Sequence, residues 1–431
     1  MVDINSIRQN PDLYKKAVID KGIDLNIDVL LRADEEKRNL LTQVEGLRKE
    51  RNDAAREKNI EKGKEIKIKL DSLEAELSKA EDKFIELAVK VPTVPSSDTP
   101  IGKSDADNIE IRKVGEIPQF DFTPKDHIQL GKELDILDFD NGAKVGGYRG
   151  YYLKNEGVML VMGLMMYALN KLIEKGFTPM IPPTLVKGFA LFGSGYFKGL
   201  VYNPETDEIY QVASPDKEAS GEVMREQKFL VGTAEPSLLA YFSGQTLKEE
   251  DLPKKVVGFS QCYRSEIGSY GKDTKGLYRV HEFMKVEQVI LSIADTEESN
   301  KLQDQMVAIS EEIHKELGLT YRVIQICTGD MSAGKYRAFD IEAWMPGLNR
   351  WGETGSASNF VDWQARRLDA KYIDKEGNRK YVFMLNNTVL PSPRPFIAIL
   401  ENFQQKDGTV VIPEVLRKYT GFSEIRPKNS R

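Results

Sequence analysis

The sequence predicts an α+β fold, in which an antiparallel sheet carries helices, with an antiparallel helical hairpin as an N-terminal arm. Beyond residue 106, many alternating segments follow one another without the strand–helix–strand rhythm of a parallel sheet. Over residues 66–91, apolar side chains recur at alternating spacings of four and three, which is the heptad pattern of a coiled coil. Residues 91–108 are rich in Pro, Ser and Asp and indicate a linker. We therefore expect two domains, an arm with its linker at 1–105 and a second domain at 106–431.

The composition indicates a protein with a large core and no membrane span. With 431 residues and 40% hydrophobic content, two or three domains are expected. The net charge of -6 does not indicate a nucleic-acid binder, so any such contact must come from a local patch. Two cysteines without a CxxC pattern favour a reducing cytoplasm, and three histidines make a Cys/His zinc site improbable. The apolar run 158–169 is too short to span a bilayer and predicts a buried core helix.

The predicted arm begins with a short helical unit over residues 1–25, where Asn10-Pro11 marks a helix start. A long charged helix begins near Asp28, and Gly63 is expected to mark the reversal into a second helix. The apolar seam of the second helix consists of Ile66, Leu70, Leu73, Leu77, Ala80, Phe84, Leu87 and Val91. The stripe of the first helix, which includes Leu41 and Val44, is weaker because Asp34, Lys37 and Arg51 fall near seam positions.

The predicted tip of the arm is basic, with acidic residues interspersed. Its cations are Arg48, Lys49, Arg51, Arg56, Lys58, Lys62, Lys64, Lys67 and Lys69. A solvated coiled coil explains such charges, and so does a dimerisation coil. A third interpretation is a lever that lays basic side chains along RNA phosphates.

Residues 259–289 predict two antiparallel strands joined by a glycine-rich loop. On the first strand, expected at about 256–266, Arg264 and Glu266 share a face because side chains alternate. On the returning strand, expected at about 279–291, Phe283 and Glu287 share a face. The loop between them holds Gly268, Gly271, Lys272, Lys275 and Gly276. A solvated hairpin with a surface ion pair explains this pattern equally well.

The stretch at 262–288, CYRSEIGSYGKDTKGLYRVHEFMKVEQ, resembles motif 2 of class II aminoacyl-tRNA synthetases, and the seryl-tRNA synthetase family in particular. GFTPMIPPTLV at 176–186 resembles motif 1, which forms the family's dimer interface. The segment around Arg394 resembles motif 3, and the N-terminal hairpin is similar to the family's tRNA-binding arm. The resemblance covers essentially the whole chain and implies a class II sheet flanked by helices.

The resemblance implies an ATP site whose catalytic residues are Arg264, Glu353 and Arg394. Arg264 would bridge the serine carboxylate and the α-phosphate, as a planar fork between two anions. Glu266 would read the adenine amino group, Phe283 and Arg394 would cover the two faces of the ring, and Arg279 would hold the outer phosphates. Glu353 would hold Mg²⁺. The remaining residues implied for ATP are Ser265, Val280, His281, Thr354, Gly355 and Ser356.

The resemblance also implies a serine site. Thr233, Ala234 and Glu235 would meet the ammonium group, together with Arg264 at the carboxylate. Glu287 and Thr388 would meet the side-chain hydroxyl, with Asn386 nearby. A site that must hydrogen-bond a hydroxyl can reject the analogue that lacks it by roughly 10⁴ or more.

Two departures from the family pattern affect this site. Thr354 and Gly355 stand where an aliphatic residue and a serine are usual. Pro391, Pro393 and Pro395 surround Arg394, and Pro391 and Pro393 remove backbone N–H donors from the approach to the helix. Pro395 suits a first helical turn.

The implied activity is ATP-dependent activation of serine and its transfer to tRNA(Ser), with tRNA(Sec) left open, by a cytoplasmic homodimer that uses Mg²⁺. Two alternatives stay open at this point. One is a relative that loads a small amino acid onto a carrier protein, against which the basic arm argues. The other is a non-catalytic tRNA-binding regulator, against which the retained charged residues argue.

Overall fold

The computed structural model describes residues 1–213, 217, 220–222, 226–267 and 275–428, which form two compact units. The first unit is Met1–Val94 and the second is Pro95–Arg431. The structural boundary therefore precedes the one expected at 105/106, because the proline-rich segment packs onto the second unit.

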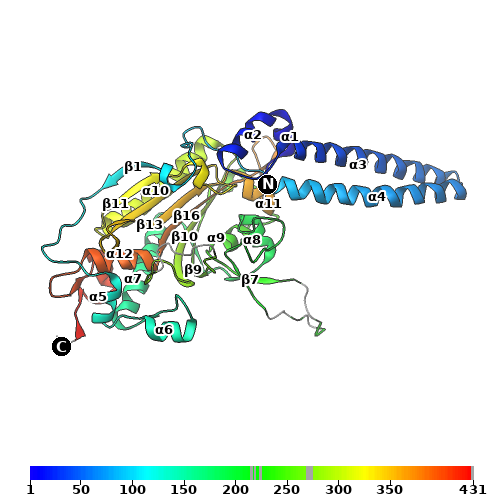
Figure 1. Cartoon of the computed structure of the whole chain (residues 1–431). Helices are drawn as coiled ribbons and strands as arrows, with labels where there is room; N and C mark the ends of the chain where they lie inside the picture. Colours follow the sequence, from blue (N-terminus) through cyan, green and yellow to red (C-terminus); the bar gives the residue numbers. More distant parts are fainter. Residues whose placement is uncertain (214–216, 218–219, 223–225, 268–274, 429–431) are drawn as a thin grey trace. The chain divides into compact units, whose positions relative to one another are not determined.

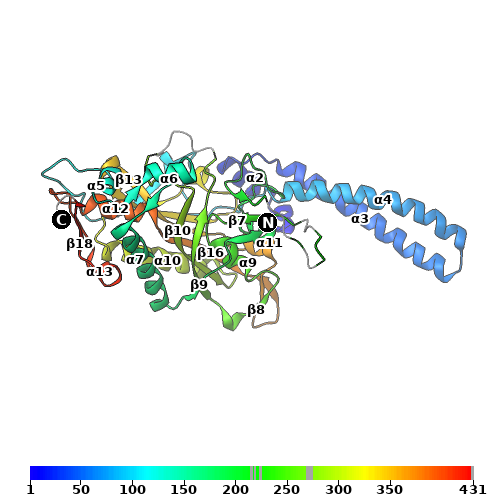
Figure 2. The ribbon, with the colours of Figure 1, turned by 90° about the horizontal axis from the view of Figure 1, so that it is seen from below.

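The first unit is helical throughout. Its elements are α1 (Ile4–Gln9), α2 (Pro11–Asp20), α3 (Ile27–Arg56) and α4 (Ile60–Ala88). Helix α2 begins at Pro11 as predicted, and Asn26 caps α3 by accepting from the backbone N–H groups of Asp28 and Val29. Helices α3 and α4 lie side by side as the predicted antiparallel hairpin (Figures 1 and 2).

The hairpin reverses at 57–59, and the prediction that Gly63 marks the turn is wrong. Lys58 takes a left-handed conformation with φ +56°, and the Asn59 side chain accepts from the N–H of Lys62 at 3.1 Å. This side-chain cap starts α4 at Ile60, so Gly63 lies inside the first turn of the helix.

The seam between α3 and α4 is apolar where the heptads predict it. Val44, Leu70 and Leu77 form a buried cluster, whereas Leu41 is exposed on the outer side. The predicted weak point, Asp34, is buried and forms a two-pronged ion pair with Arg8, both bonds being 2.7 Å long. Burial acts to raise the pKa of the Asp34 carboxyl, but the hydrogen bonds and charges of Arg8 and Arg38 lower it overall, so the carboxylate stays ionised.

The second unit is built on an eight-stranded sheet with the order β1-β11-β12-β13-β16-β10-β9-β4 (Figure 1). All neighbours are antiparallel except β4 and β9, so the predicted antiparallel sheet is confirmed with one parallel edge pair. The strands are β1 (Ile109–Val114), β4 (Thr178–Met180), β9 (Lys254–Tyr263), β10 (Glu282–Ser292), β11 (Tyr321–Gln325), β12 (Arg337–Met345), β13 (Arg350–Asn359) and β16 (Phe383–Pro391).

Small sheets and short helices surround the main sheet. The remaining strands are β2 (Leu137–Asp138), β3 (Tyr152–Leu153), β5 (Leu185–Lys187), β6 (Tyr210–Gln211), β7 (Lys228–Leu230), β8 (Thr246–Lys248), β14 (Lys371–Ile373), β15 (Arg379–Tyr381), β17 (Val410–Val411) and β18 (Glu424–Ile425). The shorter helices are α5 (His127–Glu133), α6 (Phe139–Gly146), α8 (Gly188–Ser194), α9 (Glu235–Ala240), α11 (Trp363–Leu368) and α13 (Glu414–Thr420), with 3₁₀ turns η1 (Asp105–Asp107), η2 (Glu249–Asp251), η3 (Thr328–Asp330) and η4 (Pro346–Leu348).

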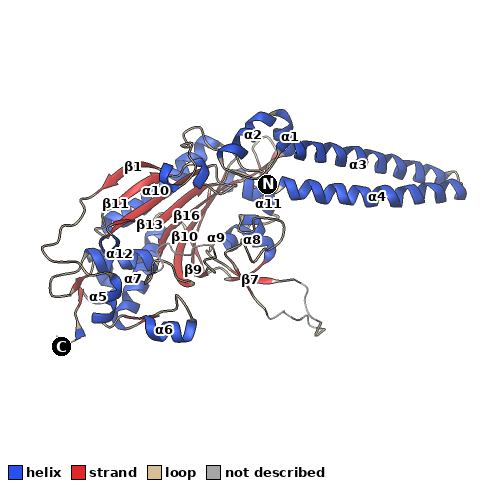
Figure 3. Cartoon of the chain, in the orientation of Figure 1, coloured by secondary structure: helices blue, strands red, loops and turns tan. Residues whose placement is uncertain are grey.

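Three longer helices pack on one face of the main sheet and enclose the largest core. They are α7 (Asn155–Glu174), α10 (Thr296–Glu316) and α12 (Pro393–Asn402) (Figure 3). Val286 of β10 and Val389 of β16 belong to this core. Because strand side chains alternate, Glu287 and Thr388 point to the opposite face, where the site lies.

Helix α7 is long and apolar enough to cross a membrane by length and composition alone. Half of that apolar window is buried inside the protein, and Leu160, Leu164 and Leu172 are fully enclosed in the core. The run at 158–169 thus forms a core helix, as predicted.

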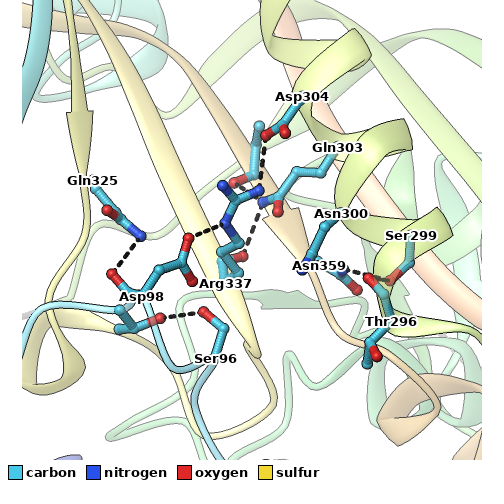
Figure 4. A network of polar contacts seen from close by, with 12 residues as sticks. Ser96, Asp98, Thr296, Ser299, Asn300, Gln303, Asp304, Gln325, Arg337 and Asn359 are labelled. Carbon is cyan, nitrogen blue, oxygen red and sulfur yellow. Dashed lines mark hydrogen bonds and ion pairs between the residues drawn. The ribbon is translucent and has the colours of Figure 1, made fainter.

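The segment after Val94 is held against the second unit rather than hanging free (Figure 4). Asp98 accepts from Arg337 at 2.9 Å through its carboxylate, and its backbone carbonyl accepts from Gln325 at 3.0 Å. The N–H of Ser96 donates to the carbonyl of Tyr336 at 2.9 Å. The predicted linker therefore includes an ordered strap on the sheet.

Candidate active site

The predicted hairpin exists, but its first strand is shorter than expected. Strands β9 and β10 pair in register from Leu291 opposite Lys254 to Glu282 opposite Tyr263. The strand expected to reach Glu266 ends at Tyr263, and Glu266 takes a left-handed conformation with φ +54°. Arg264 and Glu266 therefore reach the same pocket through a turn, and not through the alternation of side chains along a strand.

This pocket gathers most of the residues predicted for ATP. Its wall comes from the hairpin, β13, β16 and the start of α12. It is lined by Arg264, Glu266, Tyr278, Arg279, Val280, Phe283, Lys285, Glu353, Thr388, Pro391, Pro393 and Arg394. Their contacts with ATP remain predictions. The predicted loop residues Gly268, Gly271 and Lys272 lie outside the described residues.

Arg264 is held from three sides. Its backbone N–H donates to the carbonyl of His281 at 2.9 Å, and its side-chain Nε donates to the carbonyl of Gly232 at 3.2 Å. The guanidinium carbon lies 5.6 Å from the centre of the Phe283 ring. In return, the carbonyl of Arg264 bonds His281 Nδ1 at 2.8 Å, so His281 supports the arginine rather than lining the pocket. The neighbouring Ser265 hydroxyl is buried without a partner among the described residues.

Glu266 sits between two guanidinium groups. Its Oε2 is 2.8 Å from Arg279 Nη1 and 3.9 Å from Arg149 Nη1. Arg149 was not predicted, because nothing in the segment around it suggested a role. Its side chain is as buried as that of Glu266, at 6% and 7% exposed, so the two charges interact in a poorly hydrated place.

Arg394 and Glu353 face each other across the pocket. Arg394 Nη1 donates to the carboxylate of Glu353 at 3.1 Å and to its carbonyl at 2.9 Å. Burial acts to raise the pKa of the Glu353 carboxyl, but Arg394, and then Arg264, lowers it overall. Asp340 on β12 shows the opposite effect, since burial and then the charge of Glu353 raise its pKa to about 7.

None of the three residues after Glu353 is among the described residues that line the pocket. A bulge shifts the register of β12 and β13 between Ile341 and Glu342, and the Thr354 hydroxyl turns to His314 on α10 at 2.7 Å. The Thr354 hydroxyl thus bonds within the core, and an ATP contact of this residue remains a prediction. Gly355 is buried and has no side chain to offer, whereas Ser356 stands in register with both Asp340 and Thr388.

The predicted ammonium-binding carboxylate, Glu235, is the first residue of α9 and is almost fully buried. Its Oε1 accepts from Asn386 Nδ2 at 2.6 Å and from Gln364 Nε2 at 2.7 Å. Burial, and then the charge of Glu287, raises the pKa of Glu235 to about 7. Thr233 and Ala234 are fully buried beside it, where Thr233 Oγ1 accepts from the N–H of Glu235 at 3.5 Å.

Lys285, Glu287 and Thr388 form a second polar trio on the same face. The ammonium of Lys285 lies 2.8 Å from Glu287 Oε2 and 2.9 Å from Thr388 Oγ1, and Thr388 donates to Glu287 at 3.0 Å. Sequence reasoning missed Lys285 and Gln364. The alternation of side chains on β10 could have found Lys285, which is two residues from Glu287, whereas nothing local identified Gln364.

The prolines around Arg394 stiffen the approach without interrupting it. Helix α12 begins at Pro393, so Pro395 lies in its first turn as predicted. Ser392 anchors the turn, because its N–H donates to the carbonyl of Met284 at 2.7 Å and its Oγ accepts from the N–H of Met284 at 3.0 Å. Pro391 and Pro393 both line the pocket. Binding there must use side chains such as Arg394, since these two residues have no N–H group.

Comparison with known proteins defines the class. The model "tRNA synthetase class II core domain (G, H, P, S and T)" matches residues 219–403, which span the pocket. The antiparallel sheet, the motif 2 hairpin and the Glu353–Arg394 pair therefore belong to a class II aminoacyl-tRNA synthetase.

The particular family follows from matches over the whole chain. The model "Seryl-tRNA synthetase N-terminal domain" matches residues 1–95. A serine–tRNA ligase of Treponema denticola is 40% identical and covers 99% of this chain and 100% of its own length. The solved seryl-tRNA synthetase of Pyrococcus horikoshii, complexed with ATP, is 38% identical with a TM-score of 0.88, over 99% of this chain and 100% of its own. The serine–tRNA ligase of Naegleria fowleri, in complex with AMP, is 28% identical with a TM-score of 0.86, over 100% of this chain and 99% of its own. The chain belongs to the seryl-tRNA synthetase family.

Proposed function

We propose that this protein joins serine to tRNA in two steps. Serine and ATP form seryl-adenylate and pyrophosphate, and the seryl group then passes to the 3′ end of tRNA(Ser). The observation that carries the proposal is a pocket lined by Arg264, Arg394 and Glu353, beside a buried trio in which Glu235 accepts from Asn386 and Gln364. Asn386 lies two residues from the pocket residue Thr388 on β16. The family relationship supports the same reaction.

In the first step, the serine carboxylate attacks the α-phosphorus and pyrophosphate leaves. This chemistry needs positioning and charge neutralisation more than covalent help. Arg264 is fixed by Gly232 and His281, so its free fork can bridge the two reacting anions. Glu266 would read the adenine amino group, with Phe283 and Arg394 on the two faces of the ring.

Serine is selected by its two polar ends. Glu235 meets the ammonium. The positive charge of the ammonium stabilises the ionised carboxylate and so offsets the effect of burial, which otherwise favours the neutral carboxyl. The hydroxyl reaches Glu287 and Thr388, which Lys285 orients from a side chain that is only 4% exposed. Alanine has no hydroxyl to bond with Glu287 and Thr388, so it forgoes these hydrogen bonds and is discriminated against.

The residues around Glu353 fit a magnesium ion. Mg²⁺ prefers one or two carboxylates together with substrate phosphates. Glu353 offers one carboxylate, and Asp340 Oδ1 has no hydrogen-bond partner among the described residues. When bound, the ion would neutralise phosphate charge, with Glu353 as its main protein ligand.

The helical arm supplies the tRNA contact in this proposal. Seven cations near its tip are exposed and form no ion pair within residues 1–94: Lys49, Arg51, Lys58, Lys62, Lys64, Lys67 and Lys69. Arg48 and Arg56 are instead paired with Glu74 and Asp53. Unneutralised cations along a rod are suited to a row of RNA phosphates.

The working form is a homodimer in the cytoplasm. The motif 1 segment and helix α7, which precedes it, carry an apolar surface: the exposed large apolar residues of α7 are Val158, Met159, Met162, Met166 and Ile173, and Ile181 beyond β4 is 86% exposed. An apolar patch of this kind is typical of a protein interface. A solution mass equal to one 48.8 kDa chain at micromolar concentration would contradict the dimer.

The deciding experiment is ATP–pyrophosphate exchange with each amino acid, with tRNA charging measured alongside. We expect exchange with serine and charging of tRNA(Ser), and charging of tRNA(Sec) is measured in the same series. Exchange without any tRNA charging would favour a carrier-protein ligase. Binding of tRNA without exchange would favour a regulator.

A further inference from the structure

A buried histidine outside the three motifs contacts the returning arm of motif 2. His127, the first residue of α5, is 1% exposed. Its Nε2 lies 3.1 Å from the backbone N of Leu277, and its Nδ1 lies 2.9 Å from Glu401 Oε1. A backbone N–H can only donate, so Nε2 must be the acceptor and the ring proton is on Nδ1, facing Glu401.

Glu401 connects this histidine to the motif 3 helix. The carboxylate is fully buried and accepts from the backbone N–H groups of His127 at 2.9 Å and Gly347 at 2.8 Å. Arg394 and Glu401 lie seven residues apart on α12, which is about two turns, so both project from the same face of the helix.

The contacts of His127 lead back to Arg394 through the motif 2 segment that precedes β10. Tyr278 follows Leu277, and its carbonyl accepts from Arg394 Nε at 3.4 Å. The Tyr278 ring stands edge-on to His127, with the ring centres 5.1 Å apart. Gly276 has φ +62°, and a Cβ there would lie 2.0 Å from His127 Nε2, so the backbone approaches the imidazole as closely as only glycine permits.

We propose that His127 is a positioning residue for ATP binding, which fixes segment 276–279 so that Tyr278 can orient Arg394 and Arg279 can meet the phosphates. The proposal rests on the proposed function. His127 touches neither substrate, and it acts through the backbone of Leu277 and through Glu401. Serine should be unaffected, because in the described part of the chain Glu235 bonds Asn386 and Gln364 and not His127 or Glu401.

Two substitutions separate the two nitrogen atoms of the ring. His127→Asn keeps an N–H group at the position of Nδ1 but has no acceptor for Leu277. His127→Gln can place its Oε1 where Nε2 accepts from Leu277. We expect His127→Asn to raise the KM for ATP about tenfold, the effect of removing one buried hydrogen bond, and His127→Gln to stay within about threefold of the unmodified protein. The KM for serine should change by less than about twofold in both.

The matched control is Gln404→Leu. Gln404 is equally buried and ties the end of α12 to the backbone of Lys125, with bonds of 2.8 and 2.9 Å, but it does not reach Leu277. It should lower the midpoint of thermal unfolding as much as His127→Asn while leaving both KM values unchanged.

The measurement is ATP–pyrophosphate exchange on the full chain, with unfolding followed by circular dichroism. If the unmodified chain shows no serine-dependent exchange, the proposed function fails. If the unmodified chain is active, two results would overturn the inference. The first is that His127→Asn raises the KM values for ATP and serine equally, or raises neither. The second is that His127→Gln raises the KM for ATP as much as His127→Asn does. Should His127→Asn not fold, Glu401→Gln decides. A rise of threefold or more in the KM for ATP alone supports the inference, and any other result overturns it.

Discussion

The arm and the pocket both hold basic residues, but in opposite environments. The unpaired cations of the arm, such as Arg51 and Lys62, stand in solvent. In the pocket, Arg279, Lys285 and Arg394 already face the carboxylates of Glu266, Glu287 and Glu353 at 2.8 to 3.1 Å. The cations of the arm tip are therefore open to an anionic partner, whereas those of the pocket are already paired. The Lys285–Glu287 pair is buried, and the Arg394 and Glu353 side chains are 26% and 45% exposed.

This difference predicts two kinds of response to mutation and to salt. Exposed charges interact weakly and are screened within about 10 Å at 0.1 M salt. Buried partners interact strongly, and removing one leaves the other uncompensated. Changes in the pocket should therefore act steeply and with little dependence on salt, and changes in the arm should be small, additive and sensitive to salt.

Arg264→Lys should have the largest effect of any single substitution. Lysine keeps the charge but loses the planar fork that spans two anions. We expect serine-dependent exchange to fall by about 10² to 10³, the usual loss when one preorganised donor is removed, with an unchanged circular dichroism spectrum. Arg337→Lys, in the network of Figure 4, is the matched control and should retain exchange. Near-normal exchange in Arg264→Lys would remove this residue from the active site.

Thr388→Val should reduce the preference for serine over alanine. The substitution deletes the hydroxyl that bonds Lys285 and Glu287 while leaving those two charges paired. A hydrogen bond to a charged group contributes about 1.5–3 kcal/mol, so kcat/KM for serine should fall about tenfold or more, and that for alanine should change little. Unchanged discrimination would show that the hydroxyl is read elsewhere.

The KM for serine should depend on pH through Glu235. The raised pKa of about 7 means that the carboxyl is increasingly neutral below pH 7 and cannot pair with an ammonium. From pH 8 to pH 6 the ionised fraction falls about tenfold, so the KM for serine should rise by about the same factor. The raised pKa has the opposite consequence for folding. The folded state favours the neutral carboxyl, so the free energy of unfolding decreases as the pH rises through 7. A serine KM that is flat over this range would contradict the assignment.

Neutralising the arm tip should give the smallest effect per residue. Replacing Arg51, Lys62 and Lys64 by glutamine should raise the KM for tRNA several-fold and leave exchange unchanged. The slope of log affinity against log salt should flatten by roughly 0.7–0.9 for each RNA phosphate that the variant no longer neutralises. Lys83→Gln is the control, since Lys83 lies on the same arm but is paired with Glu36 at 3.0 Å. An unaltered salt slope in the triple variant would exclude the tip from the tRNA interface.

Periodic features of the fold could be predicted from the sequence, because they repeat. The heptads of α4 set one buried face, and the alternation on β10 places Val286 and Glu287 on opposite faces, as in the structure, where both faces are buried from Lys285 to Ser292. Features that depend on the conformation of a single residue could not be predicted from the sequence. The turn at 57–59 depends on one left-handed lysine and one asparagine cap, and Glu266 reaches the pocket through its own positive φ.

The site was predictable where a motif gives the residue, as for Arg264 and Arg394, and not where the support comes from distant segments. Gln364 reaches Glu235 from 129 positions away in the chain, and His127 reaches Leu277 from 150. The hydrogen bond of Thr354 to His314 could not be predicted either, because the residue lies at a bulge and no local pattern reports a bulge.

The most direct test of the contrast between arm and pocket is to replace residues 28–90 by a short loop and measure two activities. Every residue assigned to contact serine or ATP lies beyond residue 230, and the positioning residue His127 also lies outside 28–90, so serine-dependent ATP–pyrophosphate exchange should persist near the level of the intact chain. Charging of tRNA(Ser) should be nearly abolished. If the shortened protein charges tRNA at the intact rate, the arm does not read tRNA, and a coiled-coil contact with another protein becomes the better explanation.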